Sequence, residues 1–491
     1  MDIAKEQLSA IVGTENIIDD KAVLYCYSHD QSFVEKRMPD MMVFVHTVEQ
    51  IQEILRLANQ TKTPVTPFSS GLNLHGAAIP DQGGIILNMT RMNKILQIDK
   101  ENWFALVEPG VTYRDLQDEL QQRKFRMMVP FGVPPDRSVL TSYMERDVVL
   151  AAPSFENGNS LIMDMEIVLP TGDIFRTGNW TSGGNPGSQA GPIRTIIYRL
   201  WTGAQGTLGI ISKMGLQIEP LPPMRKIFFM PFDDLSRAAE AMTKIQRREI
   251  GLECFLLNNF NLAALYAEDW QIPGSYPVKP LYSEEFDGLR KELPPFMLFI
   301  CLNGGLRHPE EKIAYEEEAL KETCNLLNVA LYENLPGIPR SDRIMLEECL
   351  RPWRILRKFN FKGAVHDLTF KAPVESLPVV EQMMCDLFDA HGFSKIDTGL
   401  YIVPLERGRG VHCEFDLHCN PEEECETVRI KNLWKQASFQ LMNSGAYFDR
   451  PYGPWAEMVY GRATTYALKL RQIKAELDPN NILNPGKLCF L

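Results

Sequence analysis

The stretch TPFSSGLNLHGAAIP (residues 66–80) is short of charge, rich in Gly, Ser and Asn, and lies between apolar runs that are typical of β-strands. A loop of small residues between two strands can present several backbone N–H groups to an anion such as a pyrophosphate. The stretch matches neither the G-x-G-x-x-G fingerprint that opens a helix nor a P-loop, because the Lys-Ser/Thr ending is missing. Two interpretations therefore stay open here, an anion-binding loop and a plain tight turn.

Around this loop, from about residue 40 to 220, short apolar strands alternate with amphipathic helices. The strand at 41–46, for example, is followed by a helix that begins after Thr47, a typical N-cap residue. Residues 161–178 predict a hairpin that turns at 170–173. Beyond about residue 222 the helices are longer, which indicates a second domain that ends near residue 440. The segment 460–488 predicts one helix that ends at Asp-Pro and Asn-Pro-Gly turns.

Composition and charge argue against several classes of protein. The net charge of −12 and the pI of about 5.3 disfavour a nucleic-acid-binding surface and leave a solvated acidic surface or a basic protein partner. The ten cysteines form no C-x-x-C pair, so we expect reduced thiols and no iron–sulfur or zinc-ribbon motif. The first residues lack the apolar core of a signal peptide, and no apolar run approaches about 18 residues. We therefore expect a cytoplasmic protein without a membrane span, while a periplasmic location stays open.

Five further stretches occur in order along the chain. They are EPGVTYRDLQDEL (108–120), SVLTSYMER (138–146), EIVLPTGDIFRTG (166–178), GAQGTLGIISKMGL (203–216) and DPNNILNPGK (478–487). Together with the opening loop they resemble the vanillyl-alcohol-oxidase/4-cresol-dehydrogenase family of FAD flavoproteins, within the wider glycolate-oxidase and D-lactate-dehydrogenase superfamily. The resemblance implies an α+β fold: a two-subdomain, PCMH-type FAD-binding domain at 1–220, completed by a C-terminal segment at 441–491. An α+β cap domain at 221–440 would hold the substrate.

The resemblance also implies FAD as the cofactor and assigns residues to it. The implied cofactor-binding residues are Pro67, Ser69, Ser70, Gly71, Leu72, Asn73, Ser138, Ser142, Arg146, Gly206, Gly209, Ile210 and Lys487. Glycine allows the close approach of a backbone to a ligand, although turn geometry alone is the alternative role for each glycine. His366, in GAVHDLTF, precedes Arg450 by about the same number of residues as the histidine to which some members of the family attach FAD covalently. A packed histidine is the alternative interpretation.

Two charged residues are the main catalytic candidates. Glu145 resembles an acidic residue that phenol-oxidising members place beside the flavin, where a carboxylate can accept a proton. The alternative is that Glu145 only pairs with a charge elsewhere. Arg450, in SGAYFDRPY, matches the arginine of a Tyr-Arg pair that holds the substrate oxyanion in the family. Guanidinium suits this role because it stays charged and binds oxyanions.

The sequence departs from the family around this arginine. Asp449 replaces the paired tyrosine, and Tyr447 lies two residues away. The second tyrosine of the family, near the pyrophosphate loop, is also missing, and His75 falls at that place. The phenolate-binding set is therefore incomplete, which puts a simple para-hydroxybenzyl substrate in question. We expect Asp449, Tyr447 and His75 to shape the pocket instead.

The segment VHCEFDLHC (411–419) alternates as a strand does, which places His412, Glu414, Asp416 and His418 on one face. Such a face can hold a metal, as in the hydroxyacid-dehydrogenase relatives. Six strand residues span about 20 Å, however, so the two outer histidines cannot share one ion. We therefore favour a polar strand face and predict no metal site. His412 resembles, by position, a histidine that the family places near the substrate.

The sequence thus predicts an FAD-dependent oxidoreductase that takes a hydride from an activated C–H or C–OH carbon of a small molecule, aromatic or otherwise anionic, to flavin N5. One alternative is a D-2-hydroxyacid dehydrogenase that uses a metal, although the Gly-Glu-His-Gly signature of those enzymes is absent. Another is a flavin-carrying subunit that supports a partner and has no substrate activity alone. The expected partners are a substrate and an electron acceptor such as a cytochrome or an electron-transfer flavoprotein. We expect a homodimer or a hetero-oligomer.

Overall fold

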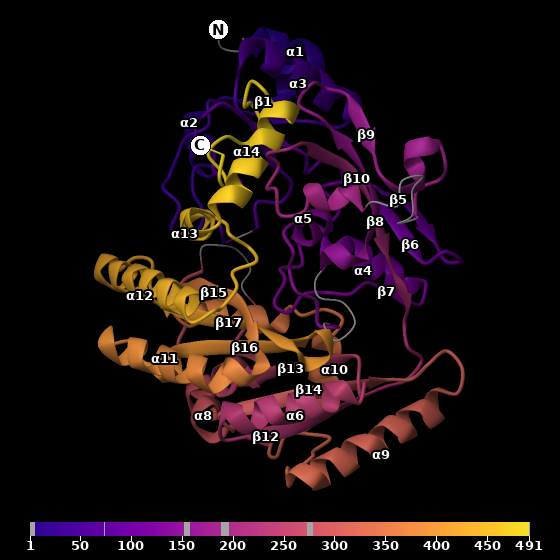
Figure 1. Ribbon diagram of the computed structural model, residues 1–491, viewed down its shortest axis with the longest axis vertical. Helices are drawn as coiled ribbons and strands as arrows, with labels where there is room; N and C mark the ends of the chain where they lie inside the picture. Colours follow the sequence, from indigo (N-terminus) through magenta and orange to yellow (C-terminus); the bar gives the residue numbers. More distant parts are fainter. Residues whose placement is uncertain (1–4, 73, 152–157, 188–195, 273–277, 491) are drawn as a thin grey trace.

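The computed structural model describes residues 5–72, 74–151, 158–187, 196–272 and 278–490, which form three main sheets with helices packed around them. Figure 1 shows the two smaller sheets in the upper half of the molecule, together with both chain ends, and the largest sheet in the lower half. In the described part of the chain, no helix combines the length and the apolar character needed to cross a membrane.

A four-stranded sheet follows helix α1 (Lys5–Val12). Its strands, in spatial order, are β1 (Ile17–Ile18), β2 (Met41–Phe44), β4 (Ile85–Asn88) and β3 (Val65–Phe68). Both β2 and β3 run parallel to β4, since helix α3 (Val48–Thr61) carries the chain back between β2 and β3. The hydroxyl of Thr47 accepts a hydrogen bond from the N–H of Gln50, which caps α3 at its predicted start.

The C-terminal tail joins the edge of this first sheet. The N–H of Val65 donates to the carbonyl of Ile482 (2.7 Å), and the N–H of Asn484 donates to the carbonyl of Val65 (2.9 Å). Residues more than 400 positions apart are thereby joined, so the tail is part of the same unit as β3.

The helix that the sequence predicts from residue 460 is divided in the structure. Helix α13 (Pro454–Arg462) ends where α14 (Thr464–Leu477) begins, and the backbone of Ala463 between them is not helical (φ −107°, ψ 50°). The prediction of one continuous helix is wrong at this point. Gly461 and the threonine that opens α14 both have low helix propensity, which weakens the pattern at the junction.

The second sheet has five antiparallel strands. In spatial order they are β5 (Ile95–Asp99), β6 (Phe104–Val107), β10 (Ile210–Gln217), β8 (Ile162–Val168) and β9 (Ile174–Arg176). The predicted hairpin between β8 and β9 is confirmed, with the N–H of Leu169 donating to the carbonyl of Asp173 (2.9 Å). Beside this sheet lie α4 (Tyr113–Gln122), α5 (Val139–Met144) and the short pair β7 (Phe125–Arg126) and β11 (Glu219–Pro220). Helix α2 (Lys21–Tyr25) packs on the first sheet, where Leu24 clusters with Met42 and Ile86.

The third sheet has six antiparallel strands. In spatial order they are β12 (Arg225–Phe232), β14 (Phe296–Asn303), β13 (Glu253–Asn258), β16 (Thr398–Leu405), β17 (Gly410–Cys419) and β15 (Ala364–Pro373). The helices of this part are α6 (Leu235–Arg247), α7 (Asn259–Tyr266), α8 (Glu284–Glu292), α9 (Pro309–Leu327), α10 (Ser341–Glu348), α11 (Leu377–Ala390) and α12 (Glu424–Asn443).

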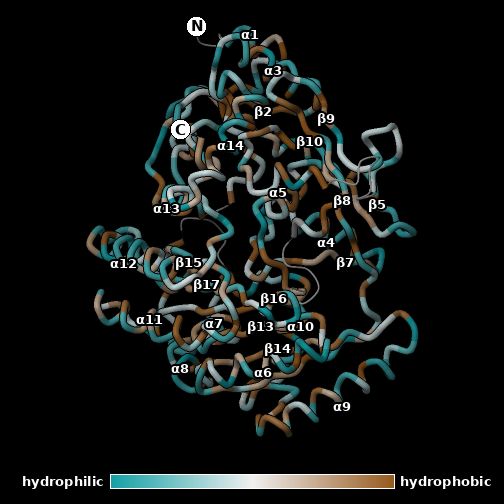
Figure 2. Tube along the Cα trace, viewed as in Figure 1, coloured by the Kyte–Doolittle hydropathy of each residue, from teal (hydrophilic) through white to brown (hydrophobic). Residues whose placement is uncertain are grey.

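Alternate residues of the third sheet belong to different hydrophobic clusters. Phe228 and Met230 lie in a cluster with residues of α6, α11 and α12. Phe229 and Phe255 lie in the cluster that also contains Met214 of the second sheet. One face of the third sheet is therefore turned toward the upper half of the molecule. Figure 2 shows the hydrophobic segments concentrated inside both halves, with hydrophilic segments along the outer helices and loops.

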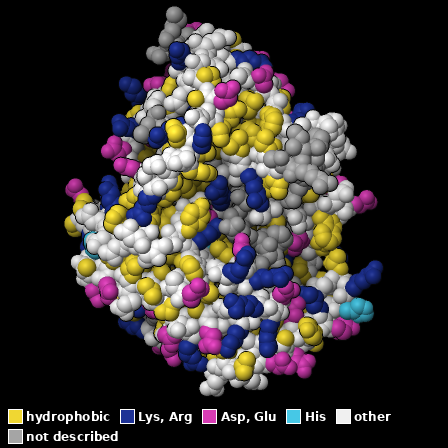
Figure 3. Space-filling model, viewed as in Figure 1, with side chains coloured by type: hydrophobic (Ala, Val, Ile, Leu, Met, Phe, Trp, Pro, Cys, Tyr) yellow, Lys and Arg dark blue, Asp and Glu magenta, His cyan; other side chains and the backbone are white. Residues whose placement is uncertain are grey.

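The surface carries both signs of charge. On the face shown in Figure 3, Lys and Arg side chains gather near the middle, and hydrophobic side chains gather over the upper half near α14. A chain with a net charge of −12 therefore still has a positive region on its surface.

Candidate active site

A groove runs between the loop after β3 and the turn before β10. It is lined, among others, by the predicted cofactor residues Pro67, Ser69, Ser70, Gly71, Leu72, Gly206, Gly209 and Ile210. The two segments approach closely because Gly206 has no side chain: a Cβ there would lie 2.3 Å from Cγ of Pro67. Gly206 also has a φ of +71°, a conformation that residues with a Cβ rarely adopt. The two segments that the sequence assigns to the cofactor are distant along the chain but line one groove.

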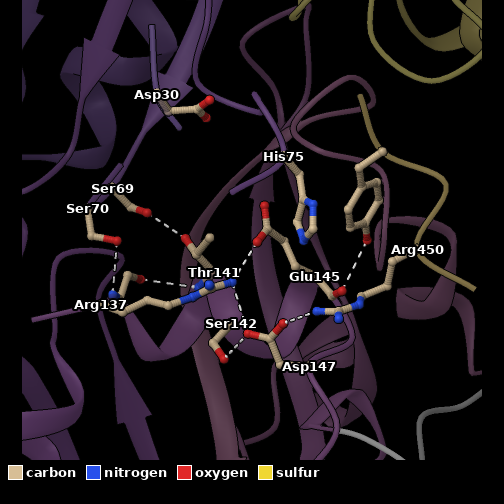
Figure 4. A network of polar contacts seen from close by, with 12 residues as sticks. Asp30, Ser69, Ser70, His75, Arg137, Thr141, Ser142, Glu145, Asp147 and Arg450 are labelled. Carbon is tan, nitrogen blue, oxygen red and sulfur yellow. Dashed lines mark hydrogen bonds and ion pairs between the residues drawn. The ribbon is translucent and has the colours of Figure 1, made fainter. Parts of the chain in front are cut away.

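The start of α5 holds the wall of this groove in place. The backbone N–H of Ser138 donates to Oγ of Ser70 (3.1 Å), and the hydroxyls of Ser69 and Thr141 lie 2.5 Å apart. The hydroxyl of Ser138 donates to the carbonyl of Pro109 (2.6 Å). Ser138 therefore lies behind the groove and positions the loop. Figure 4 shows Ser69, Ser70 and Thr141 beside the polar network of the site.

Three other predicted cofactor residues also lie outside the groove lining. They are Ser142, Arg146 and Lys487. The ammonium of Lys487 pairs with the carboxylate of Asp81 (2.9 Å). The guanidinium of Arg146 donates to the carbonyls of Thr202 (3.0 Å) and Asp449 (3.2 Å), and so ties the C-terminal segment to the first part of the chain. Asn73 lies outside the described residues.

A larger cavity of about 870 Å³ shares Gly71 and Leu72 with the groove. Its lining includes residues 130–134, the loop after α2, and residues of strands β15, β16 and β17. The candidates His75, His366, His412 and Arg450 all line this cavity. Its aromatic lining consists of Tyr25, Phe33, Phe131, Phe359 and Tyr401.

A buried chain of ion pairs runs from the groove to the cavity. The guanidinium of Arg137 contacts the carboxylates of Glu145 (2.6 Å) and Asp147 (2.9 Å), and Arg450 contacts the second oxygen of Asp147 (2.7 Å). Figure 4 shows that Arg137 and Asp147 form the middle of this chain, with Glu145 and Arg450 at its ends and His75 close by. Ser142 contributes to the same network, because its hydroxyl donates to Asp147 (2.6 Å).

Sequence reasoning missed Arg137 and Asp147. The signal that would have found them is local: an arginine just before the six-residue helix α5, and two acids just after it. A helix of fewer than two turns brings its flanking residues close together. The contact of Asp147 with Arg450, 303 residues away, has no such local signal.

Burial and neighbouring charges give the two carboxyl groups different pKa values. Burial raises the pKa of Glu145 to about 7, although Arg137 acts in the opposite direction. Burial also raises the pKa of Asp147, but Arg137 and Arg450 together outweigh it, and the pKa falls below its usual value. Asp147 is therefore ionised, while Glu145 changes its protonation state near neutral pH.

Three of the histidines that line the cavity are neutral. Burial and, to a smaller extent, the charge of Arg450 lower the pKa of His75 to about 3. Burial lowers the pKa of His366 and of His412 to about 4. Nε2 of His75 lies 3.7 Å from a carboxylate oxygen of Asp367. These imidazoles can hydrogen-bond a ligand but do not offer it a positive charge.

The structure places Asp449 and Tyr447 away from the cavity lining. The carboxylate of Asp449 is buried against the ammonium of Lys371 (2.6 Å). Tyr447 exchanges backbone hydrogen bonds with Lys371, and its side chain is 61% exposed. Their sequence neighbour Arg450 is the member of this segment that reaches the cavity.

The predicted polar strand face belongs to β17. His412, Glu414 and Asp416 line the cavity, and the ammonium of Lys358 lies 2.9 Å from Asp416 and 3.4 Å from Glu414. His418 packs against aromatic rings, including that of Phe260. Within the described ranges, no three His, Cys, Asp or Glu side chains are grouped so that they could hold a metal ion.

Comparisons with known proteins agree on one kind of protein. The profile of the FAD binding domain family matches residues 39–178, and that of the C-terminal domain of FAD linked oxidases matches residues 454–488. The 4-cresol dehydrogenase [hydroxylating] flavoprotein subunit of Pseudomonas putida is 30% identical over 511 residues, which cover 99% of this chain and 94% of that protein. Glycolate oxidase subunit GlcD of Bacillus subtilis (strain 168) is 25% identical over 502 residues, which cover 99% and 96%.

Among solved structures, p-cresol methylhydroxylase with substrate bound superimposes with a TM-score of 0.83. The two chains are 22% identical, and the match covers 99% of this chain and 96% of that one. At this level of identity the match describes the fold.

The groove fits FAD, the cofactor of these proteins. Gly71 and Gly206 allow the backbone to pack tightly along the groove, because a Cβ at either would collide with Phe68 or Pro67, and Ser69 and Ser70 supply hydroxyl groups along the same wall. Small residues and nearby N–H groups are suited to a pyrophosphate. The chain is thus an FAD-linked enzyme, and Glu145 lines the groove that fits the cofactor.

Proposed function

The chain belongs to the family of FAD-linked oxidoreductases that includes the 4-cresol dehydrogenase flavoprotein subunit, and on this premise we propose that it oxidises a small molecule at an activated C–H or C–OH carbon. The observation that carries the proposal is the cavity of about 870 Å³ that shares Gly71 and Leu72 with the FAD groove. Aromatic side chains and Arg450 line it together, which favours an aromatic or otherwise anionic substrate. Bound FAD supplies the hydride acceptor for such a reaction.

In this proposal, Arg450 attracts and orients an anionic oxygen of the substrate. Its guanidinium keeps its charge and is fixed by Asp147, so it needs little reorganisation when a ligand binds. Glu145 accepts or returns a proton at the boundary between groove and cavity. Arg137 holds Glu145 and Asp147 in place, and His75 and His412 shape the wall of the cavity as neutral groups.

We also propose that different segments of the chain bind the cofactor and the substrate. Residues 1–220 and 441–491 would bind FAD, and residues 221–440 would form the cap over the substrate. The support is that residues of β15, β16 and β17 line the cavity together with residues 130–134.

Anaerobic mixing of the holoenzyme with candidate substrates tests the proposed activity. The panel contains 4-methylphenol, 4-hydroxybenzyl alcohol, D-lactate and glycolate, and the readout is loss of the visible flavin absorbance. Reduction by an aromatic compound supports the proposal. Reduction by D-lactate or glycolate alone would favour a 2-hydroxyacid dehydrogenase, as the D-lactate dehydrogenase relative of Anaerostipes hadrus suggests. A flavin that no compound reduces would favour a subunit that carries electrons for a partner.

We expect the rate of flavin reduction to increase as the pH rises through about 7. The pKa of Glu145 lies near that value, so the carboxylate form that accepts a proton is populated mainly above it. Glu145→Gln should remove this step, and stopped-flow absorbance measures both proteins. A step that persists unchanged in the glutamine variant would exclude Glu145 as its source.

The raised pKa of Glu145 also makes stability depend on pH, and here the expected change is a decrease as the pH rises. The folded-state pKa of Glu145 lies above its usual value of 4.5, so the folded state binds the proton more tightly than the unfolded state does. The stabilisation by protonated Glu145 is therefore complete below about pH 4.5 and is lost as the pH rises through about 7. Thermal unfolding of wild type and Glu145→Gln across this range measures the difference.

A covalent bond between His366 and FAD stays a prediction. His366 lines the cavity, and its ring is stacked against Phe33 with centroids 4.1 Å apart, which fixes its orientation. We expect the flavin absorbance to stay with the acid-precipitated protein, and His366→Ala to release it into the supernatant. His391→Ala, at a half-buried histidine that pairs with Gln436 outside the cavity, is the control and should keep the flavin in the pellet. Release from wild type would show that FAD is bound without a covalent link.

A further inference from the structure

Among the described residues, six side chains that line the cavity have a buried polar atom without a hydrogen-bond partner. Three of these atoms carry the argument here: the hydroxyl of Tyr401, Nδ1 of His412 and Nε of Arg450. Tyr401 is 3% exposed and His412 is 2% exposed, so bulk solvent reaches neither side chain freely. Buried polar atoms are usually paired, and an unpaired group in a cavity wall points to a ligand that completes it.

Strand pairing places Tyr401 and His412 side by side. In the antiparallel pair of β16 and β17, Tyr401 lies opposite Glu414, and His412 lies opposite Val403. Tyr401 and His412 are therefore diagonal neighbours on one face of the sheet, with ring centroids 6.2 Å apart. The ring of Tyr401 is stacked on Phe131 at 4.9 Å, which fixes the position of its hydroxyl.

The two groups are complementary to a hydroxyl oxygen. Burial raises the pKa of Tyr401 far above its usual value, so its O–H stays a donor. His412 is neutral, so each of its ring nitrogens either donates or accepts. A substrate hydroxyl, which both donates and accepts, can pair with this set, and the charge of Arg450 lies on the same cavity wall.

We propose that Tyr401 and His412 form a specificity subsite that hydrogen-bonds a hydroxyl oxygen of the substrate. The inference rests on the proposed function, because it concerns the substrate cavity of that reaction. It also accounts for the two missing tyrosines of the family, whose places are taken by Asp449 and His75 in this sequence. The side chain of Tyr401, on β16, supplies a tyrosine hydroxyl to the cavity instead. Tyr401 and His412 act on recognition of the substrate and have no assigned part in the transfer of the hydride.

Tyr401→Phe tests the subsite, because it removes one hydroxyl and keeps the ring that packs on Phe131. Calorimetric titration of the holoenzyme with 4-methylphenol and with 1,4-dimethylbenzene compares two ligands of similar shape that differ by a hydroxyl and a methyl group. We expect Tyr401→Phe to weaken binding of 4-methylphenol roughly tenfold and to leave binding of 1,4-dimethylbenzene unchanged. The control Tyr315→Phe removes the same atom from a side chain on α9 that is 74% exposed, and should change neither affinity.

A second pair of variants keeps the test valid if Tyr401→Phe folds poorly. His412→Leu should lose the preference for 4-methylphenol, whereas His412→Asn keeps a polar atom near the place of Nδ1 and should retain part of it. Equal losses for both ligands would assign a packing role to the pair, and unchanged affinities would overturn the subsite. Wild type that binds 4-methylphenol while Tyr401→Phe is unaffected contradicts only this inference. Wild type that neither binds nor oxidises any aromatic ligand contradicts the proposed substrate class and the subsite together.

Discussion

Replacing Arg137 with methionine should lower the free energy of unfolding by about 3–5 kcal/mol, because it leaves two buried carboxyl groups without their shared partner. The guanidinium of Arg137 lies 2.6 Å from Glu145 and 2.9 Å from Asp147. Methionine has a similar length and fills the volume but carries no charge. The pKa of both carboxyl groups should rise in the variant, so the destabilisation should grow as the pH increases. Chemical denaturation of the holoenzyme at several pH values measures the effect.

An exposed ion pair supplies the matched control. Arg114 pairs with Asp136 at 3.1 Å, but the two side chains are 47% and 67% exposed. Arg114→Met should therefore change stability by less than about 1 kcal/mol. Adding Glu145→Gln to Arg137→Met removes one of the uncompensated charges and should recover part of the loss. If Arg137→Met behaved like Arg114→Met, the buried chain of ion pairs would not be what stabilises this region.

Sequence predicts this protein well where the determining contacts are local. The helix after Thr47 and the hairpin at 170–173 follow from capping and turn residues, and the structure confirms both. The resemblance, the α+β fold class and FAD as the cofactor are confirmed as well, because they rest on several stretches whose order along the chain is itself specific. The same stretches led to the prediction of cofactor-binding residues, of which Pro67, Ser69, Ser70, Gly71, Leu72, Gly206, Gly209 and Ile210 line one groove.

The details of the substrate cavity depend on contacts that sequence order does not reveal. Tyr447 is two residues from the tyrosine position of the family, yet backbone pairing with Lys371 turns it toward solvent. Tyr401 had no motif to mark it, and its place in the cavity follows from the register of β16 against β17. The same holds for Asp147, whose partner Arg450 comes from the far end of the chain. Pairing between distant segments decides these positions.

Replacing Gly206 with valine should weaken the binding of FAD roughly 100-fold and so lower the FAD content of the purified protein, the second large effect that the structure predicts. A Cβ at Gly206 would lie 2.3 Å from Cγ of Pro67, so the two loops that form the groove must separate. A β-branched residue at a φ of +71° adds a conformational cost of about 1–2 kcal/mol. Together these terms correspond to about 3 kcal/mol, or two orders of magnitude in binding. The ratio of visible to ultraviolet absorbance measures the flavin that each polypeptide carries.

Gly392→Val separates the contact between the loops from the conformational cost. Gly392 also has a positive φ, +61°, but an added Cβ there would meet nothing within 4 Å. This variant should lose a similar amount of backbone stability in thermal unfolding and keep its full flavin content, because Gly392 follows α11 and lies outside the groove. Equal loss of flavin in both variants would mean that general destabilisation releases the cofactor. Loss confined to Gly206→Val would mean that the close approach of the two loops is what holds it.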